Sequence, residues 1–135
     1  MQTLKIYDKK NKPAATSAKE IFKIMKDIKD TEKELSIVFY LDCKLKIIAR
    51  EIVLIGILDA CLVHPREIFR GAILRNAKCI ILSHNHPSGD PSPSTEDIEV
   101  YNKLKECGQI LDIKLLDNII VSDSGYYSFN ENKRD

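Results

Sequence analysis

Two of the three histidines in the chain, His84 and His86, are separated by one residue, and an acid, Asp97, follows further along. The apolar segment 79–82 that precedes them has the length and composition of a buried strand. Because alternate side chains of a strand point to the same face, both imidazoles are expected on one side and Asn85 on the other. Two imidazoles and one carboxylate are the ligands of a catalytic zinc site, with a fourth position left for water.

The loop between the histidines and Asp97 contains several prolines, which restrict its conformations. The helix after this loop can therefore bring its first turn back towards the end of the strand. A purely structural interpretation also exists, because Ser94 and Asp97 have the spacing of a capping box at a helix start. From these residues alone, a metal site and a simple helix start both remain open.

Other elements must place these residues, and the periodicity of apolar residues predicts them. Ser17 and Glu20 have the spacing of a capping box, Pro65 suits a first helical position, and Gly108 is expected to stop a helix. Residues 43–45 are expected to join two strands in a hairpin. Helices are predicted at 18–29, 65–77 and 95–107, and strands at 35–42, 46–56, 79–82, 113–121 and 126–129. This alternation predicts an α/β fold, a mixed β-sheet flanked by helices.

The length of 135 residues suits one domain. We expect a polar N-terminal leader at 1–16, the domain at 17–130 and a loose tail at 131–135. Lys and Arg number 21 against 20 acidic residues, a formal charge of +1. This balance gives little support to a general attraction to nucleic acid or anionic membranes. The lysine-rich start is interpreted as the solvated face of a helix.

The sequence has no apolar run near the roughly twenty residues that a membrane-spanning helix needs, and its start lacks an apolar secretory segment. The four cysteines are widely spaced and form no C-x-x-C pair. Such cysteines are typical of reduced thiols rather than of a disulfide framework or a thiolate zinc site. We therefore expect a cytoplasmic protein with no membrane association.

The pattern His84-x-His86-x₇-Ser94-x₂-Asp97 resembles the motif of the JAMM (MPN+) metalloprotease superfamily at every fixed spacing. The surrounding string SHNHPSGDPSPSTEDI is similar to the RadC family, the bacterial branch of that superfamily, and the resemblance covers roughly the last hundred residues. It implies a JAMM/MPN-like domain with an architecture like that of cytidine deaminases. Asn118 departs from the family, which often has histidine there. Longer members also have an N-terminal helix-hairpin-helix segment that this sequence does not contain.

The resemblance implies a role for each matching position. His84, His86 and Asp97 would bind one zinc ion, and Ser94 would donate a hydrogen bond to the oxyanion of a tetrahedral intermediate. The superfamily also uses an upstream glutamate as general acid and base. Glu34, just before the first predicted hairpin strand, matches that position, and Glu51 in the second hairpin strand is the rival, because either carboxylate could relay a proton.

The leading hypothesis is therefore a zinc-dependent metallohydrolase that cleaves a peptide or isopeptide bond of a peptide or protein substrate by metal-activated water. One alternative is an accessory protein of DNA repair or replication, or a zinc-dependent nuclease. Another is a metal-bound interaction module without catalysis. A nucleobase deaminase is excluded because the H-x-E and P-C-x-x-C elements are missing. An exposed sheet edge, such as the last strand, could pair with a second copy to form a homodimer.

Overall fold

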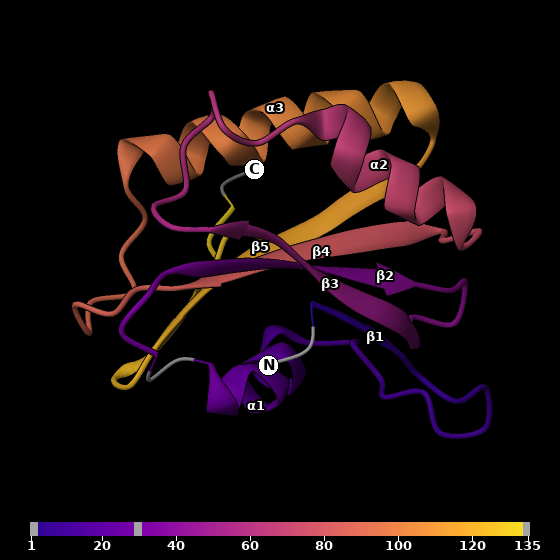
Figure 1. Ribbon diagram of the computed structural model, residues 1–135, viewed down its shortest axis with the longest axis horizontal. Helices are drawn as coiled ribbons and strands as arrows, with labels where there is room; N and C mark the ends of the chain where they lie inside the picture. Colours follow the sequence, from indigo (N-terminus) through magenta and orange to yellow (C-terminus); the bar gives the residue numbers. More distant parts are fainter. Residues whose placement is uncertain (1–2, 29–30, 134–135) are drawn as a thin grey trace.

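The computed structural model describes residues 3–28 and 31–133 of the chain. Its elements follow in the order β1 (Leu4–Ile6), α1 (Ala18–Ile24), η1 (Met25–Asp27), β2 (Leu35–Leu41), β3 (Ile47–Ile55), α2 (Pro65–Leu74), β4 (Cys79–Asn85), α3 (Thr95–Leu111), β5 (Lys114–Ser122) and β6 (Gly125–Ser128). The strands form one mixed sheet of order β1-β3-β2-β4-β5-β6. Helices α2 and α3 lie on one face of the sheet and α1 on the other (Figure 1). The predicted α/β architecture is confirmed.

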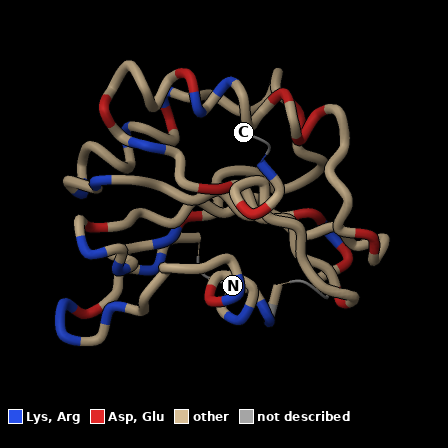
Figure 2. The backbone as a smooth tube through the Cα atoms, turned by 180° about the vertical axis from the view of Figure 1, so that it is seen from behind, with Lys and Arg blue, Asp and Glu red and all other residues tan. Residues whose placement is uncertain are grey.

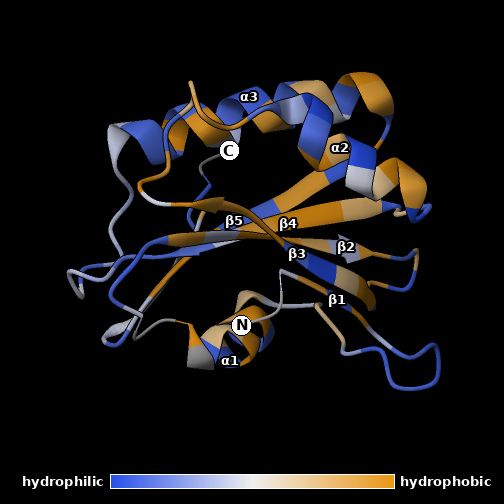
Figure 3. Cartoon of the chain, viewed as in Figure 1, coloured by the Kyte–Doolittle hydropathy of each residue, from blue (hydrophilic) through white to orange (hydrophobic). Residues whose placement is uncertain are grey.

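The central strands β2 and β4 are buried along their whole length. Strands that are covered on both faces have nearly continuous apolar sequences, and both LSIVFYL and CIIL show this character (Figure 3). Side chains on one face pack with α2 and α3 around Phe69 and Leu104. Those on the other face pack with α1 around Ile21 and Phe39. The sheet is therefore held between two apolar layers.

Strand pairing brings distant segments to the end of β4. Strand β2 runs antiparallel to β4 and places Ser36 opposite His84. Strand β5 runs parallel to β4 and places Ile120 on the other side of His84. Parallel neighbours require a long crossover, which α3 provides. The first turn of α3 consequently returns to the sheet end where β4 finishes.

Helix α3 is longer than predicted, because Gly108 lies inside it and does not end it. A Cβ atom at this position would overlap the carbonyl oxygen of Ile113. Glycine is therefore needed here for close packing and not for a left-handed turn. The helix ends at Leu111, and Asp112 takes the left-handed conformation with φ of 58°.

The start of α1 also differs from the expectation. Ser17 occupies the N-cap position, but its side chain makes no capping hydrogen bond. The carboxylate of Glu20 instead accepts hydrogen bonds from the backbone N–H and the hydroxyl of Thr16. The capping box predicted for Ser17 and Glu20 is therefore wrong, because Ser17 makes no capping hydrogen bond and the Glu20 carboxylate accepts from the backbone of Thr16. The helix was expected to reach Lys29, but α1 ends at Ile24 and the 3-10 helix η1 follows it; Lys29 itself lies outside the described residues.

Both ends of the chain contribute more structure than the sequence indicated. Leu4–Ile6, inside the segment treated as a leader, forms the edge strand β1 against β3. In the tail, the N–H of Glu131 donates to the hydroxyl of Ser128, and the N–H of Asn132 to its carbonyl. Residues 134–135 of the expected loose tail lie outside the described residues.

Within residues 3–28 and 31–133, none of the helices combines the length and the apolar character that crossing a membrane requires. The cysteines Cys43, Cys61, Cys79 and Cys107 are all free. Charge is unevenly distributed, since basic residues gather on the loop after β1 and on the turn between β2 and β3 (Figure 2).

Candidate metal centre

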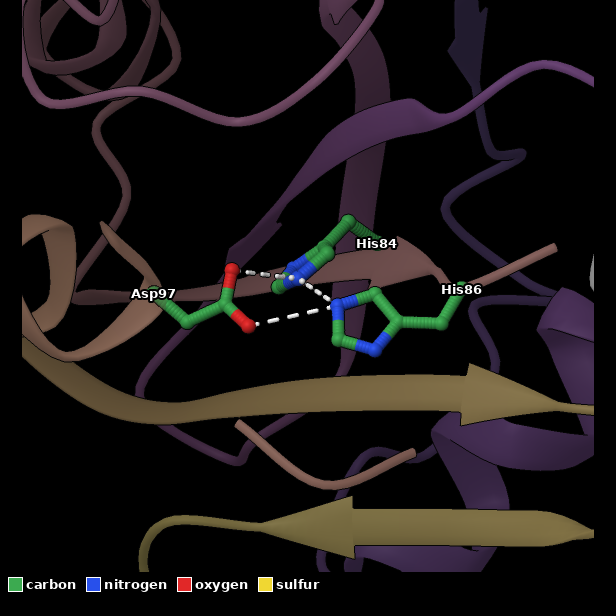
Figure 4. Close-up of side chains that lie close together, drawn as sticks. All are labelled: His84, His86 and Asp97. Atoms are coloured by element: carbon green, nitrogen blue, oxygen red, sulfur yellow. Dashed lines mark hydrogen bonds and ion pairs between the residues drawn. The ribbon is translucent and has the colours of Figure 1, made fainter. Parts of the chain in front are cut away.

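The two histidines leave the end of β4 and meet the first turn of α3 (Figure 4). His84 lies in β4, and His86 follows the strand directly. Strand alternation sends both rings to the face that α3 covers, where Asp97 points back at them. The side chains of His84 and Asp97 are buried, whereas that of His86 keeps 14% exposure. A metal ion or a substrate could therefore approach the group from the side of His86.

Three side chains converge at this point. Nε2 of His84 lies 3.0 Å from Oδ1 of Asp97, and Nε2 of His86 lies 3.2 Å from Oδ2. The two Nε2 atoms are 3.2 Å apart. Ligands about 2.0–2.1 Å from a tetrahedral zinc ion are separated by about 3.3–3.4 Å, so these spacings fit such an ion. The three residues form a group that could bind a metal ion.

The electrostatics of the group favour a cation. Burial alone would raise the pKa of Asp97, but hydrogen bonds with His84 and His86 and the charge of His84 hold it well below its usual range. The hydrogen bond with Asp97 raises the pKa of His86, against the lowering effect of burial. The lowered pKa favours the ionised form of the Asp97 carboxylate, which is the form that binds a metal.

The ring of His86 is fixed by its outer nitrogen. Nδ1 of His86 lies 2.9 Å from the carbonyl oxygen of Asp90, which can only accept, so Nδ1 carries the proton. Nε2 of His86 is therefore the nitrogen left for a metal. Asp90 holds the loop in turn, because its carboxylate accepts from the N–H of Ser92.

Ser94 and Asp97 form the capping box that their spacing predicts. The hydroxyl oxygen of Ser94 accepts from the N–H of Asp97 at 3.1 Å, and Oδ2 of Asp97 accepts from the N–H of Ser94 at 2.8 Å. The structural interpretation and the metal interpretation are thus compatible, because one cap orients the carboxylate that faces the histidines. The hydroxyl proton of Ser94 remains available to a ligand beside the site.

The two candidate glutamates lie in different surroundings. Glu34 immediately precedes β2, its carboxylate accepts from the N–H of Leu58 at 3.3 Å, and its charge contributes to the raised pKa of His86. Glu51 lies in β3, where Tyr40 donates to it at 3.4 Å and Arg75 approaches to 3.9 Å. The charge of Glu34 therefore acts on His86, whereas Glu51 is engaged with Tyr40 and Arg75.

Asn85 is a residue whose importance the sequence did not reveal. Its side chain is buried on the opposite face from the histidines, where Oδ1 accepts from the N–H of Leu35 at 2.7 Å. Its amide group donates to the carbonyls of Thr31 and Lys33 at 3.3 and 3.0 Å. These bonds attach the segment that carries Glu34 to the strand that carries the histidines. Only the pairing of β2 with β4 exposes this relationship.

Comparison with known proteins agrees with the fold and the site. The family model described as a RadC-like JAB domain matches residues 15–134. A UPF0758 protein of Geobacillus thermodenitrificans is 47% identical over 108 residues, which are 80% of this chain and 48% of that protein. A UPF0758 protein of Methanosarcina mazei is 43% identical over 129 residues, 95% of this chain and 56% of that protein.

A third relative, a UPF0758 protein of Thermotoga maritima, is 44% identical over 115 residues, 85% of this chain and 52% of that protein. The chain thus spans about half the length of the curated relatives that it matches. With the mixed sheet, the capped α3 and the convergent histidines, these matches place the chain in the RadC family, as a RadC-like JAB domain.

Proposed function

We propose that this chain is a zinc-dependent hydrolase that cleaves a peptide or isopeptide bond. The observation that carries the proposal is the convergence of two imidazole nitrogens and one carboxylate within bonding reach of a single cation. The charge of Glu34 acts on the same group. A capped helix start adds a hydroxyl, and the partial exposure of His86 supplies an approach for a substrate.

In this mechanism His84 and His86 would hold a zinc ion through their Nε2 atoms, and Asp97 would hold it through a carboxylate oxygen. A bound zinc ion supplies a Lewis acid that polarises a carbonyl and lowers the pKa of water from about 15.7 towards 7. Burial of His84 and Asp97 keeps bulk water from competing with these ligands. The protonated Nδ1 of His86 fixes that ring in its binding orientation.

The remaining steps belong to Glu34 and Ser94. Glu34 takes a proton from the attacking water and delivers it to the departing nitrogen, as a general base and then a general acid. Its hydrogen bond from Leu58 and the anchoring of its segment by Asn85 hold the carboxylate in place. Ser94 donates its hydroxyl proton to the oxygen of the scissile carbonyl as negative charge develops there.

A peptide-library cleavage assay with added zinc tests the proposal. The wild-type chain should cleave a subset of peptides, and chelation should abolish cleavage. Glu34→Gln should bind zinc as the wild type does and cleave no peptide, with Glu51→Gln as the matched control that retains cleavage. If Glu34→Gln and Ser94→Ala both left the activity intact, the chain would be a metal-bound interaction module instead.

A second candidate function, binding of nucleic acid, is favoured by one observation. Five lysines and one acidic residue line a surface pocket at the turn between β2 and β3. The lysines are Lys9, Lys10, Lys12, Lys44 and Lys46, and the acidic residue is Asp42. Asp42 pairs with Lys12 at 2.9 Å and also accepts from the N–H groups of Lys44 and Lys46. Local positive charge of this kind attracts phosphate backbones although the chain is nearly neutral overall.

Salt-dependent binding of a labelled oligonucleotide tests this second candidate. Replacing Lys9, Lys10 and Lys44 by Gln should weaken binding and reduce its dependence on salt, because fewer counterions are released. The matched control replaces three basic residues elsewhere, Arg66, Arg70 and Lys78. Equal weakening by both sets would show non-specific attraction, and hydrolysis of the oligonucleotide would reveal a zinc-dependent nuclease.

A further inference from the structure

The outer nitrogens of the two histidines differ in their surroundings. Nδ1 of His86 faces the carbonyl oxygen of Asp90. Nδ1 of His84 is buried and has no hydrogen-bond partner within the part of the chain that the structure describes. A histidine that binds a metal through Nε2 carries a proton on Nδ1, and that proton almost always reaches an acceptor. The ring that lies deepest in the site therefore requires a partner.

Two neighbouring strands offer the missing groups. Ser36 in β2 and Asn118 in β5 are fully buried. The hydroxyl of Ser36 and both polar atoms of the Asn118 side chain also have no partner among residues 3–28 and 31–133. Buried polar groups in native proteins are hydrogen-bonded in the great majority of cases, through an ordered water where no side chain reaches. Three such residues on adjacent strands call for a common explanation.

The strand register places all three side chains on the same face of the sheet. Ser36 is the residue directly opposite His84 in the antiparallel pair of β2 with β4. Directly opposed residues have Cβ atoms about 4.5–5.5 Å apart, and their side chains lie on one face. Leu82, two residues before His84 in β4, lies on that same face and packs with α2 and α3.

Asn118 in β5 is in register with Leu82. Ile119 and Val121 pack on the opposite face with α1, so alternation turns Asn118 towards the face of His84. Asn118 is thus a diagonal neighbour of His84, and Ser36 is its direct neighbour. The three residues with unpartnered polar atoms therefore lie on adjacent strands and face the same side of the sheet, and all three are fully buried.

We propose that Ser36 and Asn118 are positioning residues for the metal. Together with one internal water molecule, they accept the hydrogen bond that the Nδ1–H of His84 donates. This bond leaves Nε2 of His84 available for zinc. The inference rests on the proposed metal site. Its chemistry balances: Nδ1–H needs one acceptor, the serine hydroxyl both donates and accepts, and the amide supplies a carbonyl oxygen and an amino group. A water with three or four polar partners is typical of buried sites.

The test measures the zinc affinity of the whole chain by competition with a chromogenic chelator. Ser36→Ala and Asn118→Leu should each weaken zinc binding about 10- to 100-fold, which is the usual effect of removing a partner of a metal-bound histidine. The matched control is Ser83→Ala. Ser83 is a buried serine in β4 that donates to the carbonyl of Ile119 and pairs with Ile37 on the opposite face of the sheet. Its replacement should leave the zinc affinity unchanged.

A second readout follows the tautomer of His84 by NMR of protein labelled with ¹⁵N-histidine. The zinc-loaded wild type should show a protected Nδ1 proton on His84, and both variants should lose this protection. Wild-type zinc affinity and tautomer in both Ser36→Ala and Asn118→Leu would overturn the inference. If the wild type bound no zinc, the proposed function would fail, whereas the Nδ1 chemical shift of metal-free His84, compared between the wild type and the two variants, would still decide whether Ser36 and Asn118 contact the ring.

Discussion

Oδ1 of Asp97 lies 3.0 Å from Nε2 of His84, although a proline-containing loop separates the two residues in the sequence. The contact joins the end of a central strand to the first turn of a helix, and both partners are buried. A carboxylate in this position costs free energy unless a cation or a proton compensates it. A cation bound between the two histidines and Asp97 would therefore stabilise this buried carboxylate.

We expect the purified chain to hold about one zinc ion and to lose it in His86→Ala and Asp97→Ala. Zinc at a concentration 1,000 times its dissociation constant should add about 4 kcal/mol to the free energy of unfolding, because it binds only the folded state. Metal analysis and thermal unfolding with and without a chelator measure both effects. His64→Ala, at the N-cap of α2, is the matched control, and equal metal content in all variants would contradict the assignment.

Ser94 should have separable structural and chemical contributions. Ser94→Ala removes the acceptor for the N–H of Asp97 and should cost about 1 kcal/mol of stability, whereas Ser94→Gly should cost only a few tenths. Both variants lack the hydroxyl proton, so both should lose about 10²–10³ in the rate of cleavage. Urea unfolding and kinetics on one peptide distinguish these effects. A Ser94→Gly variant with full activity would contradict a chemical role, so that Ser94 would act only as the N-cap of α3.

Glu34 and Glu51 should respond differently to neutral replacement. Glu34→Gln should reduce the rate about 10²–10⁴-fold without loss of zinc, because the amide cannot accept a proton. Glu51→Gln should retain the rate, since Glu51 is engaged with Tyr40 and Arg75. Cleavage kinetics and metal analysis of both variants measure this. Loss of activity in Glu51→Gln with full activity in Glu34→Gln would assign the proton relay to Glu51.

Asp117 should make folding sensitive to pH. Burial raises its pKa, against the lowering effect of hydrogen bonds from Ser128, Asn130 and the N–H of Asn118. A raised pKa means that its stabilising contribution is complete below the unfolded value of 3.8 and is lost as pH rises through the folded pKa. Relative to Asp117→Asn, the wild type should therefore lose free energy of unfolding as the pH rises above 3.8 and through the folded pKa. Urea unfolding across that range measures the difference, and a difference that grew with pH would contradict the sign.

Gly108 should tolerate no side chain despite its place within a helix. Alanine favours a helix over glycine by about 1 kcal/mol, but its Cβ would overlap the carbonyl of Ile113. The overlap should dominate, so that Gly108→Ala destabilises the protein by about 1–3 kcal/mol. The exposed neighbour Gln109 supplies the control, since Gln109→Ala should change stability by less than about 0.5 kcal/mol. Stabilisation by Gly108→Ala would show that the backbone can move apart.

Interactions between residues close in the sequence allowed much of the fold and of the candidate site to be predicted. The alternation of a strand orients His84 and His86 together, and the capping box fixes the relation of Ser94 to Asp97 within one helical turn. Apolar runs of strand length showed which segments form the central sheet. In each case the determining interactions lie within a few residues of chain, so composition and spacing contain the information.

Long-range pairing decided the rest. The different surroundings of Glu34 and Glu51, the contacts of Asn85 and the place of Ser36 and Asn118 on the face of His84 all depend on which strands lie side by side and in which register. The edge strand β1 and the close packing of Gly108 depend equally on partners that lie far away in the chain. Hydrogen bonds between strands and contacts between helix and sheet form only when distant segments of the chain fold together, so a local sequence pattern does not predict them.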